Sequence, residues 1–190
     1  MVTVEEISRT YDSDPGHNEQ VTALALEFFD SLSSLHGYGK NERRLLEIAS
    51  RMHDIGWSQT VVRQHQKLSR DMILESDIPG LDEDDKLICA LVAQYHTKSL
   101  PDALKHSRFA ALSQNKRNLV EWLSAILRVA DALDSSHLGL VRKLRVEIDR
   151  KALIVHITPN GECRNEIRRA HRKEDLLVKK SERSVVYLCS

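Results

Sequence analysis

The sequence predicts a mainly α-helical fold that carries a small C-terminal β-β-α-β appendage. Apolar residues recur at helical spacing as far as about residue 140, and the pattern then changes to the alternation typical of strands. The 190 residues and the 41% hydrophobic content are enough for one sizeable core. We therefore expect a helical domain of residues 1–140 and a small α+β tail of residues 141–190, packed on that domain or extending from it.

Four segments of the N-terminal half show helical periodicity. In residues 17–35 one apolar stripe is formed by Val21, Leu24, Phe28 and Leu32, and Asp14 is the candidate cap. The next segments run from about 41 to 56, and from 61 to 74 with a weaker pattern. The fourth begins at Asp82 or Asp84, after an Ile-Pro-Gly turn at 78–80, and reaches Tyr95.

The stretch 97–118 is polar and basic, and two interpretations of it stay open. It is either a solvated connection that contains a short helical piece, or a lid over a site. A long helix follows, with its apolar residues at Leu119, Trp122, Leu123, Ile126, Leu127 and Ala130.

The tail begins with a β-hairpin. Leu144, Val146 and Ile148 alternate with charged residues, and the same alternation returns at Leu153, Val155 and Ile157. Residues 164–177 are expected to be helical, and residues 184–188 to form a closing strand. Because so small a sheet has exposed edges, we expect it either to pair across a homodimer or to pack on the helical domain.

Composition excludes several classes of protein. The 28 basic and 28 acidic residues give no net charge, so nothing draws the chain to nucleic acid or to an acidic membrane surface. No apolar run approaches the ~20 residues of a membrane span, and the first ten residues do not resemble a signal peptide. The three cysteines are widely spaced, which is typical of reduced thiols in a cytoplasmic protein.

Four polar residues lie where the helical pattern predicts buried faces. His17 lies four positions before Val21, His53 four after Ala49, and Asp131 four after Leu127, so each shares a face with apolar residues. The fourth residue, Asp54, follows His53 near the helix end.

A divalent cation explains this set better than separate structural roles do. A single such His or Asp is usually a core residue or a cap, but buried carboxylates without partners cost several kcal/mol. Imidazole and carboxylate together suit Mn, Fe, Co, Ni, Zn or Mg. His17, His53, Asp54 and Asp131 are therefore predicted to form one metal site.

The order H…HD…D resembles the signature of the HD-domain superfamily of metal-dependent phosphohydrolases. The segments LLEIASRMHDIGW, LVAQYHTKSLP and ILRVADALDSSHLGLVRKLRV are most similar to the C-terminal HD-type domain of the exopolyphosphatase and guanosine pentaphosphatase family. The resemblance implies an HD-domain helical bundle. That family carries its hydrolytic centre in N-terminal actin-like domains with phosphate-binding Gly loops, which this sequence lacks.

The resemblance also implies further site residues. His65 and His96 match the positions that complete a second metal site, so one or two ions are expected per chain; in a mononuclear enzyme they would bind phosphate. Asp54 would bridge two ions, or ligate one and orient the nucleophile, and His65 and His96 would alternatively donate protons. Arg128 is a candidate phosphate clamp, with Lys67 and Lys98 as added point charges, although a surface salt bridge is the commoner role of such residues.

Asp134 is expected either to hydrogen-bond His17 or a ligand, or to cap the segment that follows. The function that the resemblance implies is metal-dependent hydrolysis of a phosphomonoester, phosphodiester or nucleotide. The alternative is a non-catalytic or regulatory HD module that binds polyphosphate or a nucleotide. We favour the enzyme, whose partner would be a small phosphorylated substrate.

Overall fold

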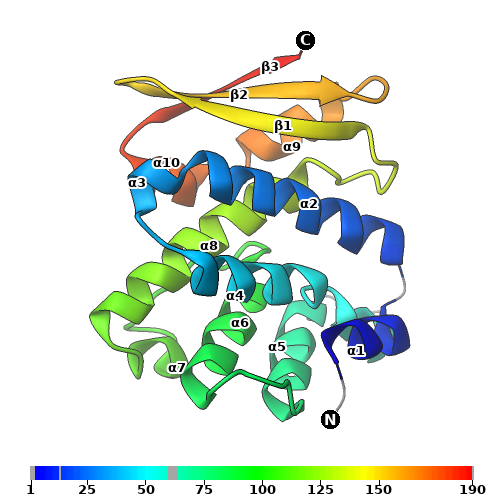
Figure 1. Ribbon diagram of the computed structural model, residues 1–190, viewed down its shortest axis with the longest axis vertical. Helices are drawn as coiled ribbons and strands as arrows, with labels where there is room; N and C mark the ends of the chain where they lie inside the picture. The colour runs from blue at the N-terminus through cyan, green and yellow to red at the C-terminus, as the bar shows by residue number, and fades with distance from the viewer. Residues whose placement is uncertain (1–2, 13, 60–63, 190) are drawn as a thin grey trace.

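The computed structural model describes residues 3–12, 14–59 and 64–189 and has the predicted fold class, mainly helical with a small C-terminal sheet (Figure 1). The N-terminal helices are α1 Val4–Tyr11, α2 Pro15–Ser31, α3 Ser33–His36 and α4 Lys40–Arg51. They are followed by the 3-10 helix η1 Ile55–Gln59 and by α5 His65–Glu75, α6 Glu83–Tyr95, α7 Ser107–Ala110 and α8 Gln114–Ala132. The C-terminal part comprises β1 Val141–Ile148, β2 Ala152–Pro159, α9 Arg164–His171, α10 Asp175–Ser181 and β3 Ser184–Cys189.

Helix α8 is the centre of the helical body. It contacts α2, α4, α6, α9 and α10, and from Leu119 to Ala132 nearly all its side chains are buried. From Leu119 onward the helix is apolar on most of its surface, which is typical of a helix that other helices surround. Any polar side chain near its C-terminal end, such as Asp131, is therefore held inside the body.

The sheet lies on one side of this body, against α2 (Figure 1). Its order is β1-β2-β3; β1 and β2 form the predicted antiparallel hairpin, whereas β3 pairs parallel to β2. The parallel pair needs a crossover, which α9 and α10 provide. The backbone N–H of Leu144 in β1 donates to Glu27 Oε2 at 2.7 Å, which ties the sheet to α2.

Several predicted boundaries differ from the structure. Helix α1 was not predicted, although Thr3 and Glu6 form a capping box that stabilises its first turn. The predicted helix 17–35 is interrupted at Leu32, and α8 begins at Gln114 rather than at 119 because the Ser113 side chain caps its first turn. The start predicted at residue 61 lies outside the described residues, and the helix is described from His65 onward.

The predicted helix 164–177 is two helices, α9 and α10, separated by a turn at residues 172–174. The short helical piece expected within 97–118 is α7. Within the described ranges, no helix is long and apolar enough to cross a membrane.

Leu153→Ala tests the core beneath the sheet. Leu153 is fully buried on the central strand, so its truncation removes apolar contacts and leaves a cavity. We expect a loss of ~2–5 kcal/mol in the free energy of unfolding, measured by urea denaturation. Leu188→Ala is the matched control, because Leu188 is 46% exposed and its truncation should cost less than ~1 kcal/mol. Equal losses would contradict this packing.

Candidate metal centre

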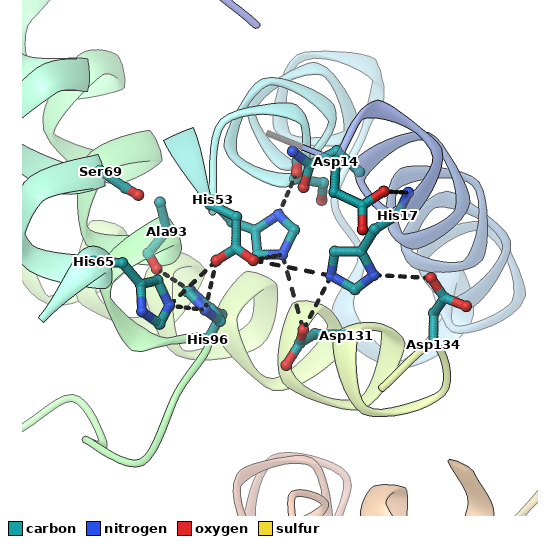
Figure 2. Close-up of polar contacts among 12 residues, drawn as sticks. Asp14, His17, His53, His65, Ser69, Ala93, His96, Asp131 and Asp134 are labelled. Carbon is teal, nitrogen blue, oxygen red and sulfur yellow. Dashed lines mark hydrogen bonds and ion pairs between the residues drawn. The ribbon is translucent and has the colours of Figure 1, made fainter. Parts of the chain in front are cut away.

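The structure brings the four predicted residues together at the meeting point of three helices (Figure 2). His17 lies in the first turn of α2, His53 and Asp54 follow the end of α4, and Asp131 lies in the last turn of α8. His17 Nε2 lies 3.6 Å from Asp131 Oδ1 and 4.0 Å from Asp54 Oδ2. His53 Nε2 lies 3.8 Å from Asp131 Oδ1 and 3.7 Å from Asp54 Oδ2.

His65 and His96 lie on the other side of Asp54. Their Nε2 atoms are 3.2 and 3.3 Å from Asp54 Oδ1, and 3.2 Å from each other. One oxygen of Asp54 therefore faces His17 and His53, whereas the other faces His65 and His96. A carboxylate in this position is placed to bridge two cations.

The spacing of these atoms suits a coordination shell. Two ligands bound at ~2.1 Å to one ion lie ~3.0–3.4 Å apart for octahedral and tetrahedral angles. The distances between the facing Nε2 and carboxylate oxygen atoms are 3.2–4.0 Å. A contraction of a few tenths of an ångström would bring the more open group, His17, His53 and Asp131, into this range.

Three of the imidazole rings are fixed through their Nδ1 atoms. The Nδ1–H of His53 donates to Ser50 O at 2.7 Å, and that of His96 donates to Ala93 O at 2.6 Å. Because a carbonyl only accepts, Nδ1 carries the proton and, in the neutral ring, Nε2 presents a lone pair to the cluster. His17 Nδ1 is held by Asp134 Oδ2 at 2.8 Å.

Within the described part of the chain, the Nε2 atoms of His17 and His53 are buried and make no hydrogen bond. A buried polar atom without a partner costs ~1–3 kcal/mol, so the fold is expected to provide one. A divalent ion between these atoms and the two carboxylates would satisfy them. The residues thus fit a metal ion on stereochemical grounds.

The electrostatics also favour a cation. Burial alone would raise the pKa of Asp131, but the imidazoles of His17 and His53 beside it hold it well below its usual range. Burial likewise opposes ionisation of Asp54, yet the charge of His53 and the neighbouring imidazoles of His65 and His96 keep its pKa far below the ordinary value. The surroundings therefore favour the ionised form of both carboxylates, which need positive charge beside them.

His17 responds to the same charges. Burial lowers the pKa of its imidazole, but the neighbouring carboxylates of Asp131 and Asp134 raise it to about 10. A positive charge between these carboxylates is therefore stabilised, whether a proton or a metal ion supplies it.

Gly56 allows α5 to approach the His53-Asp54 pair. A Cβ atom at residue 56 would lie 2.2 Å from the carbonyl oxygen of His65 and 2.7 Å from the backbone nitrogen of Ser69. The N–H of Gly56 donates to Ser69 Oγ at 2.9 Å, which fixes η1 against α5. Trp57 then stacks on the His65 ring at a centroid distance of 4.1 Å. These contacts hold His65 next to Asp54.

Asp134 combines both roles expected for it. Its Oδ2 binds His17, while its Oδ1 accepts the backbone N–H of Gly139 at 2.9 Å and so caps the turn after α8. His137 lies in this turn, stacks on His17 at 3.9 Å and binds Asp14 Oδ2 at 2.8 Å. Asp14 also caps α2, as predicted, through the backbone N–H of His17.

The predicted phosphate-binding residues do not belong to the cluster of four histidines and two aspartates. Arg128 is 2% exposed, and its guanidinium contacts the carbonyl oxygens of Tyr95 and Thr97 and the carboxylate of Asp175. Lys67 and Lys98 are exposed on the surface. The roles predicted for these three residues stay predictions. The remaining histidines contact other partners, namely His36 with Phe29, His106 with Tyr95, His156 with Glu147 and His171 with Glu174.

Lys173 lies beside the cluster, although sequence patterns gave no indication of it. Its Nζ is 3.7 Å from Asp131 Oδ2 and donates to the carbonyl oxygen of His96 at 2.9 Å. Burial lowers the pKa of this ammonium group, against the charge of Asp131. In the sequence Lys173 is one of several charged residues of a helical segment, so only the tertiary structure shows that it lies next to Asp131.

Comparison with known proteins gives one family. The family model described as Ppx/GppA phosphatase, domain III, matches residues 1–167. No curated protein matches the chain. The matched residues include all six of the clustered histidines and aspartates, and Lys173 lies beyond them.

Gly56→Ala tests how the two halves of the cluster are held together. The added Cβ would collide with backbone atoms of α5, which cannot move away as a flexible side chain could. We expect a loss of ~1–3 kcal/mol in the free energy of unfolding in urea. Gly16→Ala is the control, because the nearest atom to its Cβ lies 3.8 Å away. A stability unchanged in both variants would show that α5 does not pack on residue 56 in this way.

Proposed function

The chain belongs to the Ppx/GppA phosphatase domain III family, and on that basis we propose that it is a metal-dependent phosphohydrolase of the HD type. The substrate is a small phosphorylated compound, a nucleotide, a polyphosphate or another phosphoester. The metal ligands are His17, His53, Asp54 and Asp131 on one side and Asp54, His65 and His96 on the other.

The position of Asp54 is the observation that carries this proposal. Its two oxygens face two separate groups of imidazole Nε2 atoms at 3.2–4.0 Å. Structural carboxylates in a core are usually neutralised by Arg or Lys, whereas Asp54 is surrounded by ring nitrogens that donate electron pairs to a metal. A bridging carboxylate between two ions is the arrangement that phosphoryl-transfer chemistry uses.

Each residue then has a definite role. A bound divalent ion supplies Lewis acidity toward a phosphoryl oxygen and lowers the pKa of water. Contacts at Nδ1 with Ser50, Ala93 and Asp134 orient the rings of His53, His96 and His17, whose Nε2 atoms would hold the ion. His65, whose Nδ1 has no hydrogen-bond partner among the described residues, is oriented by its stacking on Trp57 instead. It completes the second ion site or donates a proton to the leaving oxygen.

A second function has its own support, because the matched family model describes one domain of the phosphatase, its domain III. The chain would then be a regulatory module that binds polyphosphate or a nucleotide without hydrolysing it. Turnover distinguishes the two functions, because both need a phosphorylated compound to reach the cluster. The side chains of Asp54 and Asp131 are 14% and 20% exposed, so solvent reaches part of both carboxylates.

Asp54→Asn is the direct test of the bridging residue. The substitution keeps the shape of the side chain and removes the charge that both ion positions share. We expect the purified variant to lose its transition-metal content in elemental analysis and its turnover on a phosphoester panel assayed with Mn, Co, Ni and Mg. Asp30→Asn, on an exposed residue paired with Arg43, is the matched control and should behave like the wild type. An Asp54→Asn variant with wild-type metal content and turnover would refute the proposal.

Added metal should stabilise the folded protein. An ion present at a hundredfold excess over its Kd stabilises by ~2.7 kcal/mol, which corresponds to a rise of ~5–10 °C in Tm for a chain of this size. We expect Mn²⁺ to produce this shift in the wild type, a chelator to reverse it, and Asp54→Asn to abolish it in differential scanning calorimetry. A shift of equal size in Asp54→Asn would mean that the ion binds elsewhere.

A further inference from the structure

We propose that Lys173 is a phosphate-binding residue of the candidate site, contributed by the C-terminal tail. The inference rests on the proposed function and extends it, because it names the group that recognises the anionic substrate. It also makes the tail part of the site. Lys173 lies outside the residues matched by the family model.

The first support is the position of the ammonium group. Lys173 Nζ lies 3.7 Å from Asp131 Oδ2. Within residues 3–12, 14–59 and 64–189, it is the one Lys or Arg side chain that forms an ion pair with Asp54 or Asp131. A cation at the edge of a metal cluster is placed to contact a phosphate whose other oxygens meet the ions.

The second support is the remaining capacity of this group. An ammonium group has three N–H donors, and Lys173 directs one to the carbonyl of His96 and one toward Asp131. The side chain is 25% exposed, so solvent reaches part of it, and the two contacts leave one donor for an anion. Arg128, in contrast, directs its guanidinium to backbone carbonyls and to Asp175.

The third support is the way the fold holds the turn that carries Lys173. The turn between α9 and α10 is attached on both sides of His96. Lys173 binds the carbonyl of His96 itself, and Arg128 links Asp175 at 2.8 Å to the carbonyls of Tyr95 and Thr97. The break between α9 and α10 is what places Lys173 in a turn beside the end of α6. A continuous helix over residues 164–177 would not have this turn.

The alternative is that Lys173 only balances the charge of Asp131 or holds His96 in place. Its loss would then reduce metal binding or stability. A phosphate-binding role predicts a different pattern, in which metal binding persists and the affinity for an anion falls. The two roles are therefore separable by measuring metal content and anion affinity on the same variants.

The test compares Lys173→Met and Lys173→Gln with the wild type and with Lys179→Met, a control on the exposed face of α10. Gln keeps a donor for the His96 carbonyl, so one variant preserves that contact if Met impairs folding. Manganese content is measured by elemental analysis, and pyrophosphate binding to the Mn²⁺-loaded protein by titration calorimetry. Turnover of a phosphoester is measured as kcat and KM.

We expect both Lys173 variants to keep wild-type manganese content and to bind pyrophosphate about 10–100-fold more weakly, the loss expected for one charge-assisted hydrogen bond. KM should rise by a similar factor, and Lys179→Met should match the wild type. Unchanged pyrophosphate affinity, or a loss of manganese that accounts for the weaker binding, overturns the role of Lys173. A wild type that binds manganese and pyrophosphate but has no turnover instead contradicts the hydrolase, while the affinities still decide on Lys173.

Discussion

The buried carboxylate of Asp54, surrounded by four imidazole rings, is the interaction on which the rest of the structure depends. Two ionised carboxylates at the meeting point of several helices are costly unless a positive charge lies between them. His53 lowers the pKa of both acids, while His17 adds to this effect at Asp131. The surroundings therefore favour the ionised forms, and the proposed metal ion would supply the positive charge that lies between them.

The fold provides this geometry with elements far apart in the sequence. Helix α8 holds Asp131 at its buried end, and Gly56 lets η1 lie against α5 so that His65 reaches Asp54. The C-terminal tail completes the arrangement, because the turn between α9 and α10 binds the backbone around His96. The tail thus has a structural connection to the site that its small sheet alone would not suggest.

The sequence predicted the helical body and the hairpin because their apolar residues repeat at 3.6 and 2 positions. It also placed His17, His53 and Asp131 on buried faces, since residues four apart share a face of a helix. Other parts of the site could not be predicted in this way. The carbonyls of Ser50 and Ala93, which orient two rings, belong to the backbone and have no signature in the residue type. Lys173 and the split of α9 from α10 depend on tertiary contacts, which local periodicity does not encode.

Anomalous scattering from crystals grown with Mn²⁺ is the most direct test of whether the cluster binds a metal ion through Asp54. We expect anomalous density beside Asp54 Oδ2, with the Nε2 atoms of His17 and His53 as ligands, and a second peak beside Oδ1 if two ions bind. Manganese density located elsewhere on the chain, or none within the cluster at saturating Mn²⁺, would contradict it.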